Sequence, residues 1–151
     1  VESGYQTTTE KTKRKSPSSF DFNPVKADES FTTNLKEMGN ILLGNDSNAI
    51  IVDARTSDQF SSGHIPSSVN ISIDDILNND KTFKTSQELA AIFTGKGVTP
   101  DKNVFVYSNT GAQSSLVWFV LHELMGYPNV KNYDGGFKEW RYRERPVEKG
   151  A

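Results

Sequence analysis

The sequence predicts an α/β fold in which a central, mostly parallel sheet is flanked by helices. Short apolar runs of strand length alternate along the chain with segments whose apolar residues recur at helical spacing. Strands that alternate with helices in this way form a parallel sheet that is covered on both faces. The length of 151 residues suits one such domain and a short extension.

The extension is expected at the N-terminus. Residues 1–24 are rich in Thr, Ser, Lys and Pro, and they contain a basic run at residues 11–15. This composition is typical of a solvated linker, so we place the folded domain at residues 25–151. The first residue is Val1 and not Met, which indicates a fragment or a processed product.

The first half of the domain contains one predicted helix and two predicted strands. Apolar residues recur at helical spacing over residues 28–43, which predicts a helix. Residues 49–55 form a β-branched run that ends in polar residues, as a buried strand of a parallel sheet does. Residues 69–71 read as another short strand after a Pro-containing turn.

The second half begins with a helix signal. Thr85 and Glu88 fit a capping box, which predicts a helix that ends at Gly95. Residues 104–107 form an apolar strand, and the helix expected over residues 114–125 is apolar nearly all round, which predicts that it is buried. A last strand over residues 129–133 and a short helix that contains Trp140 complete the fold.

Composition excludes several kinds of site and partner. A net charge of −2 argues against direct nucleic-acid binding, and no stretch is apolar and long enough to span a bilayer. The chain has no cysteine, and its two histidines lack metal-ligand spacing, so we expect no metal and no other cofactor. Without a signal-peptide pattern, a cytoplasmic or mitochondrial location is expected.

The loop that follows the strand at 104–107 is the predicted site of chemistry. Ligands of open parallel sheets bind beyond the carboxyl ends of the strands, and residues 108–113 are polar and contain glycine. Consecutive loop amides form an anion-binding concavity, and the N-terminus of the next helix adds partial positive charge. A cysteine at position 108 would ionise easily in that field.

Three motifs resemble the signatures of the rhodanese family. Residues 51–55 with residues 63–71 resemble its first signature, residues 104–113 resemble its active-site region, and residues 133–140 resemble its closing motif. The resemblance covers residues 25–150 and implies a rhodanese-like three-layer sandwich with a five-stranded sheet. It also implies a persulfide-forming cysteine at the position that Ser108 occupies here.

A finer resemblance concerns residues 4–9. They resemble the tail of a preceding rhodanese domain in tandem sulfurtransferases, whose C-terminal domain performs the chemistry. This implies that the chain is such a C-terminal domain and that its partner N-terminal rhodanese domain is missing. The Asn- and Ser-rich composition points to a fungal source. With a fungal source, the resemblance to tandem sulfurtransferases implies the member that serves tRNA thiolation.

Ser108 predicts that the chain as written is inactive, because a hydroxyl without an adjacent base is a poor nucleophile. Either cysteine was deliberately replaced by serine or a natural relative has lost its nucleophile; the intact loop favours the first. The resemblance of the loop is closer to mercaptopyruvate-type than to thiosulfate-type members. The loop residues that bear on this choice are Asn109, Thr110, Gly111, Ala112 and Gln113.

The side chains expected to support the loop lie at the end of the strand at 49–55 and in the turn that follows. Arg55 is the candidate holder of the substrate anion, because its planar fork suits a carboxylate or a thiosulfonate; a structural pair with a nearby acid is the alternative. We expect Asp53 to orient Arg55 or to bind backbone amides. His64 is expected to be a structural histidine of its turn.

The functional hypotheses fall into three classes. The first is sulfur transfer from 3-mercaptopyruvate or thiosulfate to a thiol, to cyanide or to a protein such as thioredoxin or a tRNA-thiolation protein. The second is a non-catalytic rhodanese-like binding or regulatory module, which Ser108 favours. The third, a phosphatase relative, needs an arginine that closes the loop, whereas positions 114 and 115 are both serine.

Overall fold

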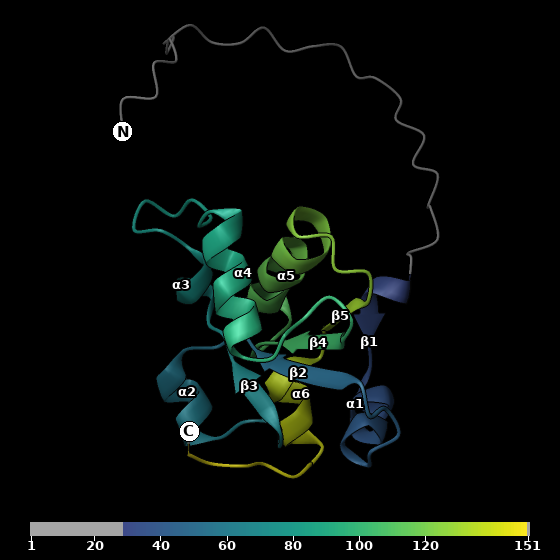
Figure 1. Cartoon of the computed structure of the whole chain (residues 1–151). Coiled ribbons are helices and arrows are strands. Elements are labelled where there is room, and N and C mark those ends of the chain that lie inside the picture. The colour runs from purple at the N-terminus through teal and green to yellow at the C-terminus, as the bar shows by residue number, and fades with distance from the viewer. Residues whose placement is uncertain (1–28, 151) are drawn as a thin grey trace, which may run out of the picture.

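The computed structural model describes residues 29–150 and shows a parallel sheet between two layers of helices (Figure 1). The strands lie in the order β1-β5-β4-β2-β3, and every neighbouring pair is parallel. The predicted α/β class and three-layer architecture are therefore confirmed. The linker predicted for residues 1–24 and the motif at residues 4–9 lie outside the described residues.

The strands are β1 (Thr32–Thr33), β2 (Ala49–Asp53), β3 (Ser68–Asn70), β4 (Asn103–Tyr107) and β5 (Val130–Tyr133). The helices are η1 (Glu29–Phe31), α1 (Leu35–Leu42), α2 (Ser57–Ser62), α3 (Ile73–Ile76), α4 (Ser86–Gly95), α5 (Ala112–Phe119), η2 (Val120–Leu124) and α6 (Gly136–Tyr142).

Successive side chains of β4 point to opposite faces of the sheet and contribute to a separate hydrophobic core on each face. Val104 and Val106 pack among buried residues of α3, α4 and α5, which we call the α4–α5 core. Phe105 and Tyr107 point the other way, into the α1–α6 core that Trp140 fills. Because successive side chains of a strand point to opposite faces, one apolar strand can support both cores. Figure 1 shows α3, α4 and α5 on one side of the sheet and α1, α2 and α6 on the other.

The strand register brings two polar chain segments to one edge of the sheet. Asp53 of β2 pairs with Tyr107 of β4, and the Ala54 N–H donates to the Tyr107 carbonyl at 2.8 Å. The residues that follow β2 and the loop that follows β4 therefore lie next to each other at the carboxyl ends of these two strands. These are the two strand ends at which the sequence predicted chemistry.

The predicted helix over residues 28–43 is wrong in its first part. Helix α1 begins only after Asn34, which is its N-cap. The Asn34 side chain accepts hydrogen bonds from the N–H groups of Lys36 and Glu37 at 3.0 and 3.1 Å. Thr33 lies before that cap and pairs with Tyr133 of β5, so the segment contributes an edge strand. The predicted capping box of α4 is confirmed, with Thr85 as the N-cap.

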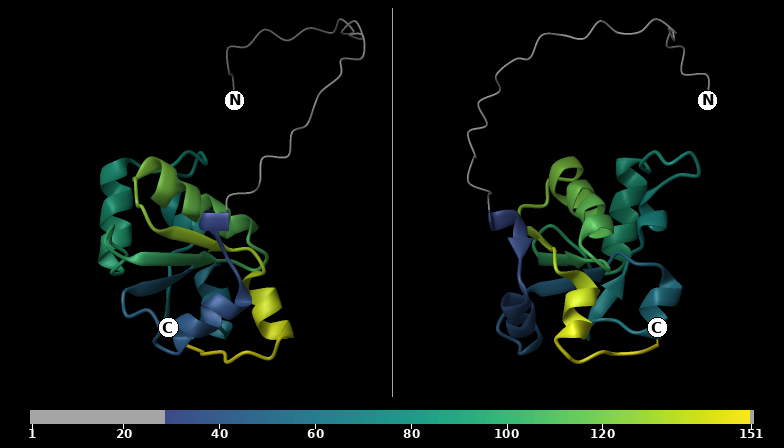
Figure 2. Two further views of the ribbon diagram at one scale, coloured as in Figure 1. Left: turned by 90° about the vertical axis from the view of Figure 1, so that its right-hand side faces the viewer. Right: turned by 180° about the vertical axis from the view of Figure 1, so that it is seen from behind.

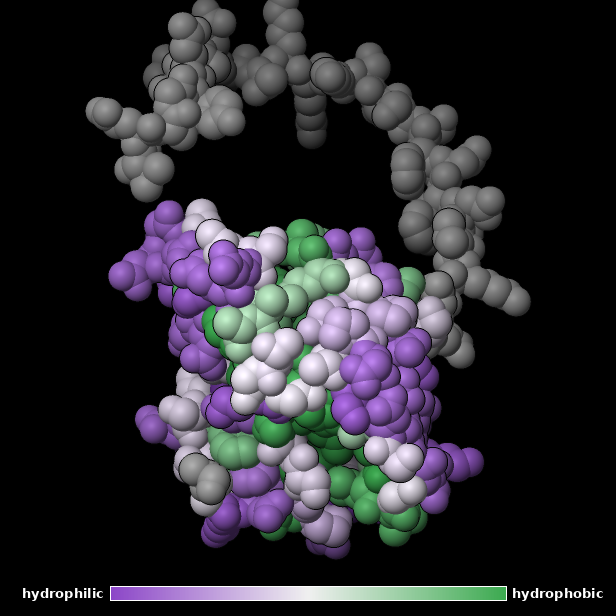
Figure 3. Space-filling model, in the orientation of Figure 1, coloured by the Kyte–Doolittle hydropathy of each residue, from purple (hydrophilic) through white to green (hydrophobic). Residues whose placement is uncertain are grey.

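The predicted burial of the helix over residues 114–125 is also wrong. The helix consists of α5 and a π-helical turn, η2, in which the Met125 N–H donates to the Val120 carbonyl. One stripe of the helix faces the sheet, whereas Phe119 and Leu124 are 41% and 48% exposed. Figure 3 shows this apolar surface near the end of α5. Among residues 29–150, no helix has the length and hydropathy required to traverse a bilayer.

Gly136 fixes the start of α6 against the loop after β4. Its φ is +59°, and a Cβ at this position would lie 2.5 Å from the Ser108 carbonyl oxygen and 2.7 Å from that of Asn109. Both the backbone conformation and the close approach therefore require glycine. The start of α6 and the loop form one structural unit, although α5, η2 and β5 lie between them in the sequence.

We predict that Gly136→Ala lowers the free energy of unfolding by roughly 1–3 kcal/mol, because the added methyl group forces the loop and α6 apart in a strained backbone. Gly39→Ala is the matched control, since Gly39 lies inside α1 and has nothing within 4 Å of its Cβ position. It should be neutral or stabilising by up to about 1 kcal/mol. Urea unfolding of both variants measures the difference, and equal stabilities would contradict the prediction.

Candidate active site

Ser108 directly follows β4 and is 1% exposed. The hydroxyl of Ser114 is placed to donate to Ser108 Oγ at 3.3 Å. The same Ser114 hydroxyl is also within hydrogen-bond distance of the Gly111 carbonyl oxygen, at 2.9 Å. Among residues 29–150, Ser108 Oγ has no other hydrogen-bond partner. The side chain is therefore enclosed beside a second hydroxyl, and no titratable group is placed to remove its proton.

The carbonyl groups of the loop are bound by neighbouring elements. The Ser108 carbonyl accepts from the N–H of Phe137 at 2.8 Å, and the Asn109 carbonyl accepts from the N–H of Lys138 at 3.1 Å. Because the C=O and the following N–H of a trans peptide point in opposite directions, this bonding turns the next N–H groups away from α6. The start of α6 thus sets the orientation of the first loop peptides.

The N–H groups of the loop are free to bind a ligand. Within the described part of the chain, none of the N–H groups of residues 109–114 donates a hydrogen bond. Gly111 turns the loop with a φ of +75° and serves as the N-cap of α5. Free amides at the start of a helix favour negative charge, so this loop is suited to a small anion.

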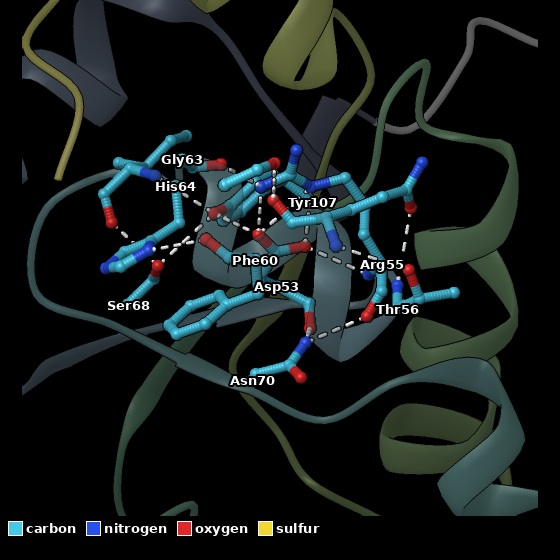
Figure 4. A network of polar contacts seen from close by, with 12 residues as sticks. Asp53, Arg55, Thr56, Phe60, Gly63, His64, Ser68, Asn70 and Tyr107 are labelled. Atoms are coloured by element: carbon cyan, nitrogen blue, oxygen red, sulfur yellow. Dashed lines mark hydrogen bonds and ion pairs between the residues drawn. The ribbon is translucent and has the colours of Figure 1, made fainter. Parts of the chain in front are cut away.

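Asp53, the last residue of β2, forms a buried ion pair with Arg55 (Figure 4). The Arg55 Nη2 lies 2.5 Å from Asp53 Oδ2, and Nε lies 2.9 Å from Asp53 Oδ1. Nη2 also donates to the Gly63 carbonyl at 2.8 Å, and the guanidinium lies 3.9 Å from the centre of the Phe137 ring. Although burial opposes its charge, the hydrogen bond and charge of Asp53 raise the pKa of Arg55.

This ion pair changes the expected use of Arg55. The fork that the sequence suggested for an external anion is engaged with Asp53 and Gly63. Of the three guanidinium nitrogens, only Nη1 has no hydrogen-bond partner among residues 29–150. Asp53 holds Arg55 in this orientation, and an anion in the loop can receive at most one guanidinium nitrogen.

Tyr107 ties this ion pair to the strand that leads into the loop. Its hydroxyl donates to Asp53 Oδ2 at 2.5 Å, accepts from the Ile65 N–H at 3.0 Å and lies 3.2 Å from Ser68 Oγ. Burial raises the pKa of the Tyr107 hydroxyl well above its usual range, and the adjacent Asp53 carboxylate raises it further. Tyr107 is therefore a neutral hydrogen-bond donor.

His64 lies in a structural position, away from the loop. Its ring stacks on Phe60 at 3.8 Å between centroids, and Nδ1 lies 2.9 Å from the Phe60 carbonyl oxygen. Its backbone exchanges hydrogen bonds with Glu148, whose carboxylate is 3.7 Å from Nε2. These contacts join the turn after α2, where Figure 4 shows His64 beside Phe60, to the C-terminal segment.

Sequence reasoning missed the supporting roles of Ser114 and Asn132. Asn132 Nδ2 donates to the Gly111 carbonyl at 3.3 Å, and its buried Oδ1 has no partner among residues 29–150. Asn132 lies between Lys131 and Tyr133 in a short strand, and nothing in the sequence singled it out or distinguished Ser114 from Ser115. Residues 29–150 contain no group of His, Asp and Glu side chains that could hold a metal ion.

We predict that Tyr107→Phe lowers the free energy of unfolding by roughly 1–3 kcal/mol, since it leaves the Ile65 N–H and Asp53 short of a buried partner. The effect should depend on pH. The unfolded chain loses the tyrosine proton above about pH 10, whereas the folded chain retains it because its pKa is raised. This contribution is complete below pH 10 and is lost as the pH rises toward the folded pKa.

The measurement compares urea unfolding of the parent and variant chains between neutral pH and pH 11. The stability of the parent should fall more steeply above pH 10 than that of Tyr107→Phe. Because the other tyrosines are common to both chains, they do not contribute to the difference. Parallel curves would show that Tyr107 ionises at its usual pH.

Comparison with known proteins finds relatives in sequence and in fold. The family model described as "Rhodanese-like domain" matches residues 35–143. A protein of Haloferax volcanii named "Putative thiosulfate sulfurtransferase" is 40% identical over 66% of this chain and 41% of its own length. The "Sulfur carrier protein TtuD" of Thermus thermophilus is 49% identical over 52% of this chain and 27% of its own length.

A solved structure shares the fold with a TM-score of 0.75 and 26% identity, over 83% of this chain and 33% of the other. It is a variant of EanB in complex with ergothioneine that is covalently linked to a persulfide cysteine. The chain spans well under half the length of each of these proteins. Fold, motif positions and the match over residues 35–143 lead to one assignment: the chain belongs to the rhodanese-like domain family.

Proposed function

We propose that position 108 is the sulfur-carrying position of a sulfurtransferase domain, and that the chain with Ser108 binds the sulfur donor without transferring its sulfur. The observation that carries the proposal is the run of free N–H groups at residues 109–114 beside residue 108. The relatives named as a thiosulfate sulfurtransferase and a sulfur carrier support the same class of reaction.

With cysteine at position 108, the thiolate attacks the outer sulfur of thiosulfate and forms a sulfur–sulfur bond to the protein. The sulfur–sulfur bond of thiosulfate breaks, and sulfite leaves with its electron pair. An acceptor thiolate then takes the outer sulfur of the persulfide and restores the protein thiolate. Free amides stabilise the negative charge that is present at each stage.

With Ser108, the reaction cannot proceed beyond the binding of the sulfur donor. A hydroxyl is a much weaker acid than a thiol and needs a base to act as a nucleophile. Its neighbour in the structure is the hydroxyl of Ser114, which does not supply one. Sulfane sulfur also forms no stable persulfide on oxygen, so the donor anion would occupy the loop unchanged.

A sulfur donor bound in the loop would contact mainly neutral groups and little positive charge. Residues 108–113 contain no cationic side chain, and Arg55 contributes at most Nη1. Both 3-mercaptopyruvate and thiosulfate present an anionic group that backbone amides can bind. We propose either as donor, and a thiol or protein as acceptor, with thioredoxin and a tRNA-thiolation protein as candidates in the cytoplasm or mitochondria. A preceding rhodanese domain would complete the protein.

The second candidate function is a binding module that holds an anion or a partner without chemistry. Ser108 favours it, because the chain has every loop amide in place but no thiol. The two functions share the anion site and differ in what a restored thiol would do. One substitution therefore distinguishes them.

We predict that Ser108→Cys takes up one sulfur atom from thiosulfate or 3-mercaptopyruvate and that the uptake is reversed by a thiol. Ser86→Cys is the matched control, because Ser86 is an exposed serine in the first turn of α4 and the parent chain has no cysteine. Intact-protein mass spectrometry detects the added sulfur. Failure of a correctly folded Ser108→Cys to gain sulfur would favour the binding module.

We also predict that the thiol introduced at position 108 has a lower pKa than the one introduced at position 86, because free loop amides stabilise its thiolate in addition to the helix N-terminus. The pH dependence of alkylation by iodoacetamide measures both pKa values. Added thiosulfate should slow alkylation at position 108 and leave position 86 unaffected. Equal pKa values would contradict the proposed role of the loop amides.

A further inference from the structure

Helix α6 carries a basic surface beside the candidate site. Lys138, Arg141, Tyr142 and Arg143 form this surface, which we call the α6 basic surface, and all are exposed. Tyr142 is 80% exposed, and the guanidinium of Arg143 lies 5.8 Å from the centre of its ring. In the view from behind in Figure 2, α6 lies at the surface of its layer.

The cations of this surface are unpaired. In the part of the chain that the structure describes, the side chains of Lys138, Arg141 and Arg143 make no ion pair within 4 Å and no hydrogen bond. Of the nearby acids, Glu139 accepts a hydrogen bond from the Tyr133 hydroxyl at 2.8 Å, and Asp134 and Glu144 are exposed without an ion pair. The surface thus keeps its positive charge for a ligand, in a chain whose net charge is −2.

This surface is hollowed and adjoins the loop. Lys138, Tyr142 and Arg143 line an open cavity of about 360 Å³ together with Gly135 and with Glu139, whose carboxylate accepts a hydrogen bond from the Tyr133 hydroxyl. The residue before Gly135 approaches the loop so closely that a Cβ on Gly111 would lie 2.8 Å from the Asp134 carbonyl oxygen. The N–H of Lys138 itself donates to the Asn109 carbonyl. A molecule seated in the cavity would therefore lie next to the loop of position 108.

We infer that the α6 basic surface docks an acidic segment of the protein that accepts sulfur from position 108. This inference rests on the proposed function and specifies its partner. Residue 108 is 1% exposed, so an acceptor must bring its nucleophile in on a narrow chain segment. Exposed cations attract an acidic segment, and tyrosine and arginine are enriched at protein interfaces.

A protein fits this surface better than a nucleic acid does. Nucleic-acid binding relies on an extended basic stripe that neutralises several phosphates, and the overall charge of this chain is negative. The α6 basic surface is confined to two turns of a short helix with a cavity at its centre. An acidic peptide strand matches that size.

The first experiment measures docking without chemistry. A fluorescent oligoglutamate peptide should bind the chain with Ser108, and Arg141→Glu combined with Arg143→Glu should weaken binding about tenfold at low salt. Lys81→Glu combined with Lys96→Glu is the control, because it changes the net charge equally at exposed sites that lie before and just after α4. About 1 M salt, where the Debye length is about 3 Å, should abolish the difference.

The second experiment measures sulfur transfer from persulfidated Ser108→Cys. A cysteine peptide with an acidic flank should accept sulfur about tenfold faster than the same peptide with a neutral flank, and the α6 double substitution should remove that preference. Transfer to dithiothreitol should be unchanged by the substitution, because a small neutral thiol does not need the surface.

The outcomes separate the inference from the proposed function. Sulfur uptake and transfer to dithiothreitol without any preference for acidic peptides would overturn the docking surface alone. Peptide binding that depends on Arg141 and Arg143, with no sulfur uptake, would overturn the proposed reaction and retain the surface. Tighter binding of a single-stranded RNA oligonucleotide than of oligoglutamate would overturn the inference of a protein partner.

Discussion

The bonds between the first turn of α6 and the carbonyl groups of Ser108 and Asn109 are the constraint on which the rest of the site depends. They occupy the acceptors of the loop and leave its donors free. A loop whose carbonyls faced the same space would repel the anion that its amides attract. Gly136 permits this arrangement, because only glycine allows the two backbones to approach so closely.

The Asp53–Arg55 pair supports the site from the neighbouring strand end. A buried ion pair is costly unless hydrogen bonds satisfy its remaining polar atoms, and here Tyr107 and the Gly63 carbonyl do so. Phe137 lies under the guanidinium and donates its N–H to the Ser108 carbonyl, so it contacts both halves of the site. The charge of Arg55 is consequently used to hold strand ends, turn and α6 together.

The sequence was sufficient to predict the fold class, the two strand ends and the loop at residues 108–113, because these follow from local patterns. It was not sufficient for features that depend on distant partners. Whether Arg55 binds Asp53 or an external anion is decided by where Gly63 and Phe137 lie. Thr33 belongs to an edge strand only because it pairs with β5. Phe119 and Leu124 are exposed because a different stripe of their helix packs on the sheet.

The position of α6 after all five strands in the sequence has a consequence for biosynthesis. Proteins are made from the N-terminus, and residues 29–133 contain every strand of the sheet and the whole loop. Until residues 136–138 have left the ribosome, nothing binds the carbonyl groups of Ser108 and Asn109. The nascent domain can therefore assemble its sheet first, and its loop becomes competent to bind an anion only after residues 136–138 have been made and have folded against it.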